Sequence, residues 1–370
     1  MVSIGMRRDA GTQVAPDAPA TTLVGLTHWR WSELLGPIVL VVVAAYPSAL
    51  ISPGMRFMVE GALALLVMVL ALQVFIGNSG VLSFGHGAFA LVGGFTTGLL
   101  TMPTLVKENV LTDLLPFLQS AHTTMALGIL LGVLVSAIVG LLVGVFLMRL
   151  HGLAAGIATF AVLMVADNIF FNARSVGPGP QVMPQIPRFP FLEVSLLLAV
   201  VAIVVAYAVG VSRSGRLLRA SREDYLAAQA LGASIWRLRV LYFTISAGMA
   251  GLSGAMYAHH AAAVSARDFY LGFTFMTLGM LIIGGSGSVW GAVVGCVVVT
   301  ALSQVLLDLE QGLQLGNLIF EIPAGARSIA IAAALVLVLM WRPSGITGGA
   351  EFRLPGRRRK APAADSVVNS

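Results

Sequence analysis

Ten apolar segments, most of them close to twenty residues long, recur along this 370-residue chain and constrain its fold more than any other feature. A helix of about 20 apolar residues crosses the ~30 Å hydrocarbon core of a bilayer, and only helices and closed barrels satisfy their backbone hydrogen bonds inside that core. The sequence therefore predicts an all-α polytopic membrane protein with about ten membrane-embedded helices, including short or broken ones. The expected segments are 34–51, 57–76, 82–101, 123–148, 152–171, 193–211, 237–261, 272–284, 288–307 and 323–341.

The composition agrees with a membrane protein, because 58% of the residues are hydrophobic and only 10% are charged. A soluble domain carries roughly 25% charged residues. One expected segment, 272–284, is too short to cross the whole core at 1.5 Å per residue. It is expected to be a half-helix buried among its neighbours, where such a break is tolerated.

The basic residues predict the orientation, because cytoplasmic loops carry an excess of Lys and Arg. With both termini inside, sixteen basic residues fall in inner segments and five in outer loops. The tryptophans fall near the inner ends of spans, as an aromatic belt would place them. The net charge of +6 therefore reports topology, and nucleic acid is not an expected partner. The predicted location is the cell (inner) membrane, multi-pass, with both termini cytoplasmic.

The domain organisation follows from these spans. Residues 1–33 are expected to be a disordered cytoplasmic tail, since Asp9, Pro16 and Asp17 interrupt the region where a cleavable signal would be apolar. Residues 34–348 form the expected transmembrane domain, and residues 349–370 a basic cytoplasmic tail.

The longest inner loop, residues 212–236, carries a helix signature. Ser221 is a good N-cap, Glu223 and Asp224 place negative charge in the first turn, and Gly232 stands where a left-handed C-terminal residue is expected. The small residues between them would allow close approach of a partner protein. The alternative is a surface helix that merely ties two spans together.

Two glycine-rich turns occupy matching places in the two halves of the chain. Residues 77–80 (GNSG) precede a span that begins with SFGHGAF, and residues 284–287 (GGSG) precede SVWGAVVG. Paired interruptions of this kind point to the substrate site of transporters, although chance and helix packing also produce them. The candidate path residues are Ser83, Phe84, Gly85, His86, Gly284, Gly285, Gly287 and Ser288.

The sequence gives little support for a catalytic site or a metal site. No His, Asp or Glu lies three or four residues from His86, so a hydrogen-bonded structural role is expected for that ring and no metal site is predicted. Cys296 is the one cysteine, which excludes disulfides and thiolate clusters. Neither Lys107 nor Lys360 belongs to a GxxxxGK[ST] loop, so this chain is not an enzyme that hydrolyses ATP.

Four motifs together resemble the LivM-type permeases, the membrane subunits of ABC importers for branched-chain amino acids. They are SFGHGAF (83–89), REDYLAAQALGAS (222–234), IGGSGSVWGAVVGCVV (283–298) and WRPSGI (341–346). The resemblance implies a helical permease that pairs with a second, LivH-like permease, two cytoplasmic ATPase subunits and an extracytoplasmic solute-binding protein. ATP and Mg²⁺ would be used by the ATPase subunits, and this chain itself would bind no cofactor. Beyond these subunits, membrane lipid is the one other expected partner.

The resemblance also implies that the 212–236 loop docks onto the ATPase, through Arg222, Glu223, Asp224, Ala227, Ala228, Leu231 and Gly232. Relatives that import urea or short amides make a urea or amide importer the alternative function. A second alternative function is a self-sufficient channel or secondary carrier. The Pro-rich outer loop 176–190 departs from the family's glycine-rich pattern at this place.

Overall fold

The computed structural model describes residues 31–175, 177–189, 191–230, 232–310, 313–315, 318–320, 323, 325–342 and 344–352. Residues 1–30 of the expected tail 1–33 and most of the expected tail 349–370 lie outside these residues, whereas residues 31–33 are helical and begin α1. The structure is helical, as the sequence predicted, with one small hairpin in which β1 (Leu313–Leu315) pairs antiparallel with β2 (Leu318–Phe320).

The ten expected segments all correspond to helices. In chain order these are α1 (Trp31–Ile51), α2 (Pro53–Leu72) continued by the π-helical turn η1 (Gln73–Gly77), α3 (His86–Thr101), α6 (Met125–Leu147), α7 (Leu153–Asn172), α8 (Leu192–Val211), α11 (Ile235–Ala261), α12 (Leu271–Gly284), α13 (Val289–Glu310) and α14 (Ala326–Trp341). Shorter elements lie between them: α4 (Thr104–Val110), α5 (Pro116–Ser120), α9 (Arg213–Glu223), α10 (Tyr225–Ala230) and the 3₁₀ turn η2 (Ala266–Phe269).

Not all ten helices are long enough to cross a membrane alone. Among the described residues, eight are long and apolar enough, and α3 with α4 forms a ninth if their 114° bend marks one broken span. The expected span 82–101 is shorter than predicted, because residues 82–85 are not helical and α3 starts at His86. The segment 272–284, expected to be too short to cross the membrane, is the 14-residue helix α12, but together with the preceding turn η2 it forms the 19-residue stretch Ala266–Gly284, which is one of these eight.

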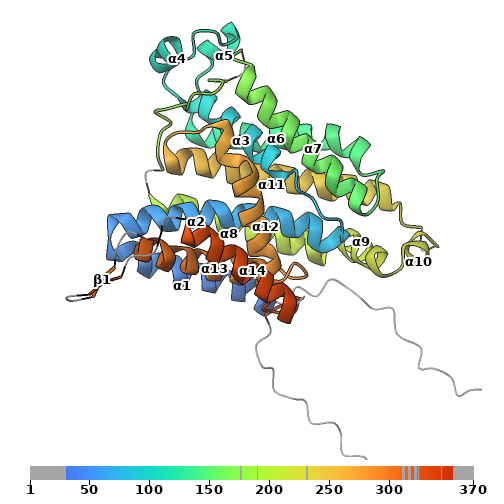
Figure 1. Cartoon of the computed structure of the whole chain (residues 1–370). Helices are drawn as coiled ribbons and strands as arrows, with labels where there is room; N and C mark the ends of the chain where they lie inside the picture. The colour runs from blue at the N-terminus through green and yellow to red at the C-terminus, as the bar shows by residue number, and fades with distance from the viewer. Residues whose placement is uncertain are drawn as a thin grey trace, which may run out of the picture.

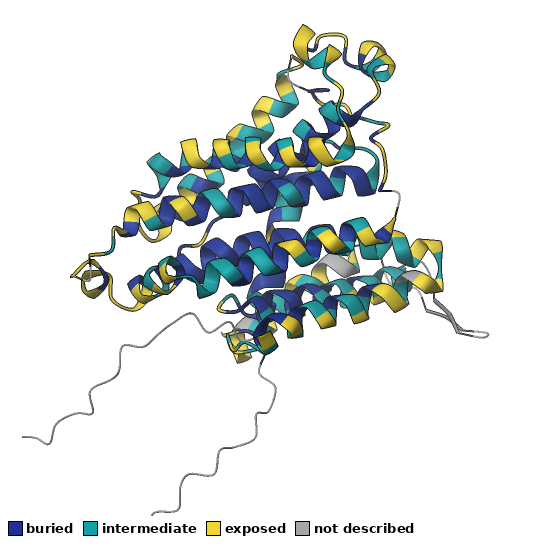
Figure 2. Ribbon diagram, turned by 180° about the vertical axis from the view of Figure 1, so that it is seen from behind, coloured by how far each residue is buried: buried dark blue, intermediate teal, exposed yellow. Residues whose placement is uncertain are grey.

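The helices form two layers, best seen in Figure 1. One layer contains α3, α6, α7 and α11, and the other contains α1, α2, α8, α13 and α14, with α2 and α11 in contact between them. The short helix α12 runs across the direction of its neighbours between the layers. Figure 2 shows the burial that results: α2 and α11 are mostly buried, whereas α6 and α7 expose one long face.

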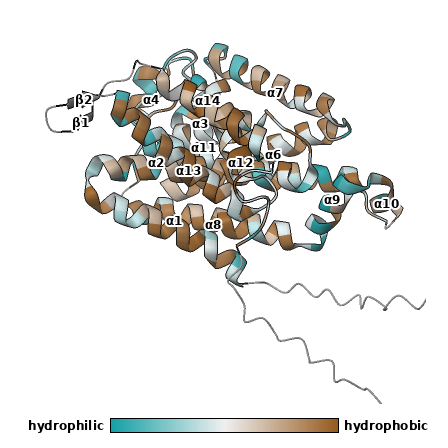
Figure 3. Cartoon of the chain, turned by 60° about the horizontal axis from the view of Figure 1, so that its bottom comes forward, coloured by the Kyte–Doolittle hydropathy of each residue, from teal (hydrophilic) through white to brown (hydrophobic). Residues whose placement is uncertain are grey.

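The exposed faces are apolar, as lipid contact requires. Figure 3 shows hydrophobic residues along α1, α8 and α13, and hydrophilic residues gathered on α9 at one end. Small residues bring the inner helices together: a Cβ added to Gly254 of α11 would overlap the Ala90 carbonyl oxygen of α3. Close helix approach through small residues is the usual packing mode in membranes.

Candidate coupling loop and helix breaks

The first helix break follows α2 and is buried. The π-turn η1 ends at Gly77, the chain turns through Gly80 in the left-handed region (φ +69°), and α3 starts at His86. Asn78 is buried and donates from Nδ2 to the Val74 carbonyl at 2.8 Å. The amide of Asn78 is therefore hydrogen-bonded within the bundle.

His86 holds the break to α11 through both ring nitrogens. Its Nδ1 lies 2.9 Å from Ser83 Oγ, and its Nε2 lies 2.9 Å from Ser246 Oγ. The ring is fully buried, and Phe75, Phe89 and Phe243 surround it with centroids 5.6–6.1 Å away. With both nitrogens occupied, the ring has the hydrogen-bonded structural role that the sequence predicted.

The neighbouring candidate path residues pack against α7. Ser83 is buried, and a Cβ on Gly85 would lie 2.5 Å from the Thr159 carbonyl oxygen. Phe84 donates from its backbone N–H to Thr159 Oγ1 at 3.1 Å and keeps its ring partly exposed. Of these path residues, Phe84 is therefore the one with an accessible side chain, and its ring faces Phe275 of α12 at 6.1 Å.

The second break, between α12 and α13, is covered by the C-terminal segment. The Ile346 and Thr347 N–H groups donate to the carbonyl oxygens of Ile283 and Gly284 at 2.8 and 3.2 Å, and Thr347 Oγ1 donates to Gly284 at 2.8 Å. Gly285 adopts φ +113°, which a residue with a side chain rarely accepts. Gly284 is buried in the same turn, whereas Gly287 is exposed.

The start of α13 is capped from two directions. Ser288 Oγ accepts the Gly291 N–H at 2.9 Å, and the Glu351 carboxylate accepts the N–H groups of Val289 and Trp290 at 2.9 and 3.2 Å. Burial of Glu351 raises the pKa of its carboxyl. The Phe352 ring also lies against Trp290 with centroids 4.9 Å apart, so residues 351 and 352 of the expected C-terminal tail pack against the start of α13.

The two breaks meet inside the protein. A Cβ on Gly77 of the first break would overlap the carbonyl oxygen of Ser286 in the second. The paired glycine turns are therefore adjacent in space, although they are far apart in the sequence. The sequence pattern linked the two turns but did not predict their contact.

The 212–236 loop contains two helices where the sequence predicted one. Residue Ser221 was expected to cap the helix, but it lies within α9 and its Oγ donates to the Leu218 carbonyl at 2.7 Å. The actual cap of α10 is Asp224, whose Oδ1 accepts the Ala227 N–H at 3.0 Å. Gly232 adopts φ +81° and closes the turn with an N–H to the Gln229 carbonyl at 2.8 Å, as predicted.

Arg222 connects this loop to the first break. Its Nη1 donates to the Gly77 carbonyl oxygen at 2.5 Å. A Cβ on Gly80 would lie 3.0 Å from Arg222 Nε, so the side chain passes directly over the break. Glu223, the next residue, is exposed at the end of α9.

The exposed face of α10 differs from the expected one. Ala227 is exposed, but Ala228 is buried at 2% exposure and packs inward, so it cannot be an outer contact. Leu231 lies outside the described residues. Leu226 is 74% exposed and Tyr225 37%, which gives α10 an apolar outer surface. Leu226 was not among the expected contact residues, although a large apolar residue within a polar loop was the available signal.

Three contacts anchor the 212–236 loop to α6 and the α6–α7 turn. Trp236 Nε1 donates to the Val145 carbonyl at 3.3 Å, and the Arg149 guanidinium lies 5.6 Å from the Trp236 ring centroid. His151 meets Tyr225 edge to face at 5.8 Å. The loop thus contacts α6, the α6–α7 turn and the first break together.

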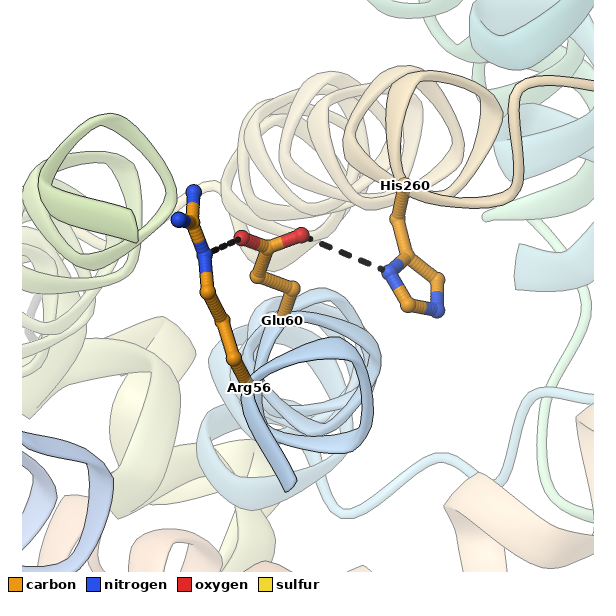
Figure 4. Close-up of polar contacts among 3 residues, drawn as sticks. All are labelled: Arg56, Glu60 and His260. Atoms are coloured by element: carbon orange, nitrogen blue, oxygen red, sulfur yellow. Dashed lines mark hydrogen bonds and ion pairs between the residues drawn. The ribbon is translucent and has the colours of Figure 1, made fainter. Parts of the chain in front are cut away.

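A charged cluster lies at the opposite end of α2, shown in Figure 4. Glu60 accepts a hydrogen bond from Arg56 Nε at 3.0 Å, and its other oxygen lies 3.9 Å from His260 Nδ1. Arg56 supplies the counter-charge for Glu60 where α2 meets α11. Across the ranges that the structure describes, no three His, Cys, Asp or Glu side chains converge as a metal site.

Comparisons with known proteins agree with this architecture. Residues 55–340 match the family model described as the permease component of branched-chain amino acid transport systems. The chain is 26% identical to the high-affinity branched-chain amino acid transport permease protein LivM of Salmonella typhimurium, over 83% of this chain and 73% of that protein, and 24% identical over the same shares to LivM of Escherichia coli. The LivH permease of Salmonella typhimurium is 30% identical over 38% of this chain and 41% of its own. No solved structure gives a significant match.

Proposed function

Since this chain belongs to the family of permease components of branched-chain amino acid transport systems, we propose that it is a membrane subunit of an ATP-driven ABC importer for branched-chain amino acids or related small polar solutes. The observation that carries the proposal is the contact of Arg222 with the first helix break. Through it, a loop outside the membrane spans reaches the helix interruptions inside the bundle.

The proposed assembly contains this chain and a second permease, two cytoplasmic ATPase subunits and an extracytoplasmic solute-binding protein. Relatives named LivM and LivH both resemble this chain, which supports a pair of related permeases. ATP and Mg²⁺ act at the ATPase in this proposal. The location that follows is the cell (inner) membrane, with both termini and the 212–236 loop on the cytoplasmic side.

The ATPase docks on α10 in this proposal. Leu226 and Ala227 are exposed there, and an exposed large apolar side chain outside the membrane fits a protein interface. Asp224 and Gly232 fix the two ends of the helix, while Arg222 and Glu223 precede it. A push on α10 would be transmitted by Arg222 to Gly77, and from Gly77 to Ser286 of the second break.

The solute path is proposed to pass beside the two breaks. Phe84 and Phe275 present partly exposed rings at the edge of the first break, on the side of α12. Ser83, Gly85 and His86 would support the path from behind, since they are packed into the bundle. Gly284, Gly285, Gly287 and Ser288 form the matching turn, whose rearrangement would accompany opening.

Uptake measurements test the solute class. Proteoliposomes holding the complete importer are given labelled leucine, with unlabelled isoleucine, valine or urea as competitor. Competition by isoleucine and valine, but not by urea, is the expected result. Competition by urea alone would replace the amino-acid proposal with the urea or amide importer, and leucine uptake without any ATPase subunit would replace it with a self-sufficient carrier.

A further inference from the structure

A long apolar groove lies between α1, α2 and α13, away from both helix breaks. It encloses about 440 Å³. Its walls are aliphatic over most of their length, and Cys296, Leu63 and Val41 lie at its deep end. Ser48, Thr300, Gln304 and Asp308 line it toward the end where α1 passes into α2.

The length of the groove matches the hydrocarbon of one leaflet. From Cys296 to Asp308 the helix α13 rises about 18 Å at 1.5 Å per residue, close to the ~15 Å depth of one leaflet of hydrocarbon. An acyl chain that lies along the groove therefore reaches from its deep end to its mouth.

The charge at the groove mouth selects the head of that occupant. Asp308 is the one charged side chain among the lining residues, and its Oδ1 accepts a hydrogen bond from Gln304 Nε2 at 2.8 Å. Within the described part of the chain, no cationic side chain pairs with Asp308. A carboxylate without a counter-charge at the mouth of an apolar groove is complementary to an ammonium group.

A zwitterionic amino acid fits this groove less well. The carboxylate of an amino acid would need a cation or several hydrogen-bond donors, whereas the charged side chain that lines the groove is the carboxylate of Asp308. One wall of the groove is α1, which lies outside the family match at residues 55–340. A transport path common to the family therefore does not require α1. The groove is thus separate from the proposed transport path.

We propose that this groove binds one phospholipid with a primary-ammonium headgroup, one acyl chain lying between α1, α2 and α13 and the ammonium at Asp308. The lipid would fill the space between α1 and the family-matched helices and so hold α1 against them. This proposal does not depend on the solute that the protein transports.

Native mass spectrometry of the full chain in mild detergent tests it with two added lipids of identical acyl chains, phosphatidylethanolamine and phosphatidylglycerol. The expected result is one retained phosphatidylethanolamine, with phosphatidylglycerol bound about fivefold more weakly, as one ion pair near a surface allows. Equal retention of the two lipids would overturn the assignment of the headgroup to Asp308.

Two variants with matched controls locate the site. Ala301→Phe should fill the groove, since Ala301 lines it and is exposed, and should weaken lipid retention about tenfold. Val298→Phe adds the same ring to an exposed position of α13 that does not line the groove and should leave retention unchanged. Asp308→Asn should remove the preference between the two lipids, whereas Glu108→Gln, at an exposed position on α4, should not. Retention in Ala301→Phe equal to that in Val298→Phe would overturn the groove as the binding site.

Discussion

The guanidinium of Arg222 donates a hydrogen bond to the carbonyl oxygen of Gly77 over 2.5 Å, although 145 positions separate the two residues. Gly77 ends the π-helical turn after α2, and a carbonyl there is free of the regular helix ladder. On its other side Gly77 lies against the Ser286 carbonyl of the second break. One side chain of the 212–236 loop therefore contacts the point where both helix breaks meet.

Gly77→Ala should disrupt the contact between the breaks. The added Cβ would overlap Ser286, and overpacking of this kind costs about 1–3 kcal/mol. The melting temperature of the purified chain in detergent should fall, and solute uptake with it. Gly54→Ala is the matched control at the start of α2, where an added Cβ has no neighbour closer than 3.9 Å. An equal melting temperature for the two variants would refute the close contact.

The two faces of α10 should respond differently to the same charge. Leu226→Glu places it on the exposed face, so the permease should accumulate normally but lose its ATPase on co-purification. Ala228→Glu places it at a buried position and should lower the amount of folded protein, because a buried unpaired charge is costly. Retention of the ATPase by Leu226→Glu at the wild-type level would show that α10 is only a tether between helices.

His86→Leu should lower the thermal stability of the protein, and this loss should not depend on a metal ion. The substitution leaves the hydroxyl of buried Ser83 without its partner, and an unsatisfied buried group costs about 1–3 kcal/mol. His122→Leu, at an exposed position, serves as the control in the thermal unfolding measurement. A metal-binding role would instead make the wild-type protein sensitive to EDTA, which this account does not expect.

The orientation can be read from two single cysteines in a Cys296→Ser background. Gln229→Cys lies on the exposed part of α10, and Glu108→Cys on the exposed part of α4. In intact cells, a membrane-impermeant maleimide should label position 108 and spare position 229, which becomes reactive only after permeabilisation. The reverse pattern would invert the topology that the basic residues predict.

The sequence predicts those parts of this protein that depend on local pattern. Apolar length located all ten helices, and glycine chemistry predicted the left-handed Gly232. The N-cap was assigned wrongly because Ser221 and Asp224 are both good caps, and nothing local showed that α9 continues through Ser221.

Contacts between segments far apart in the sequence could not be predicted from local sequence pattern. The Glu351 carboxylate caps α13 from 62 residues away, and no periodicity in the sequence reports such a contact. Ala228 was expected to face a partner because it is small, but its direction depends on how α10 rests against neighbouring elements. The adjacency of Gly77 and Ser286 was suggested only indirectly, by the matching positions of two glycine clusters.

The stoichiometry of transport in Arg222→Gln tests the central claim most directly. Complete importers containing this variant or the control Arg213→Gln, an exposed residue at the start of α9, are reconstituted into proteoliposomes, and solute imported per ATP hydrolysed is measured. If Arg222 transmits docking to the helix breaks, the variant should retain its ATPase and hydrolyse ATP, while import per ATP falls about tenfold or more, as expected for loss of a charged hydrogen bond. Import per ATP equal to that of Arg213→Gln would contradict the claim that this contact couples the loop to the breaks.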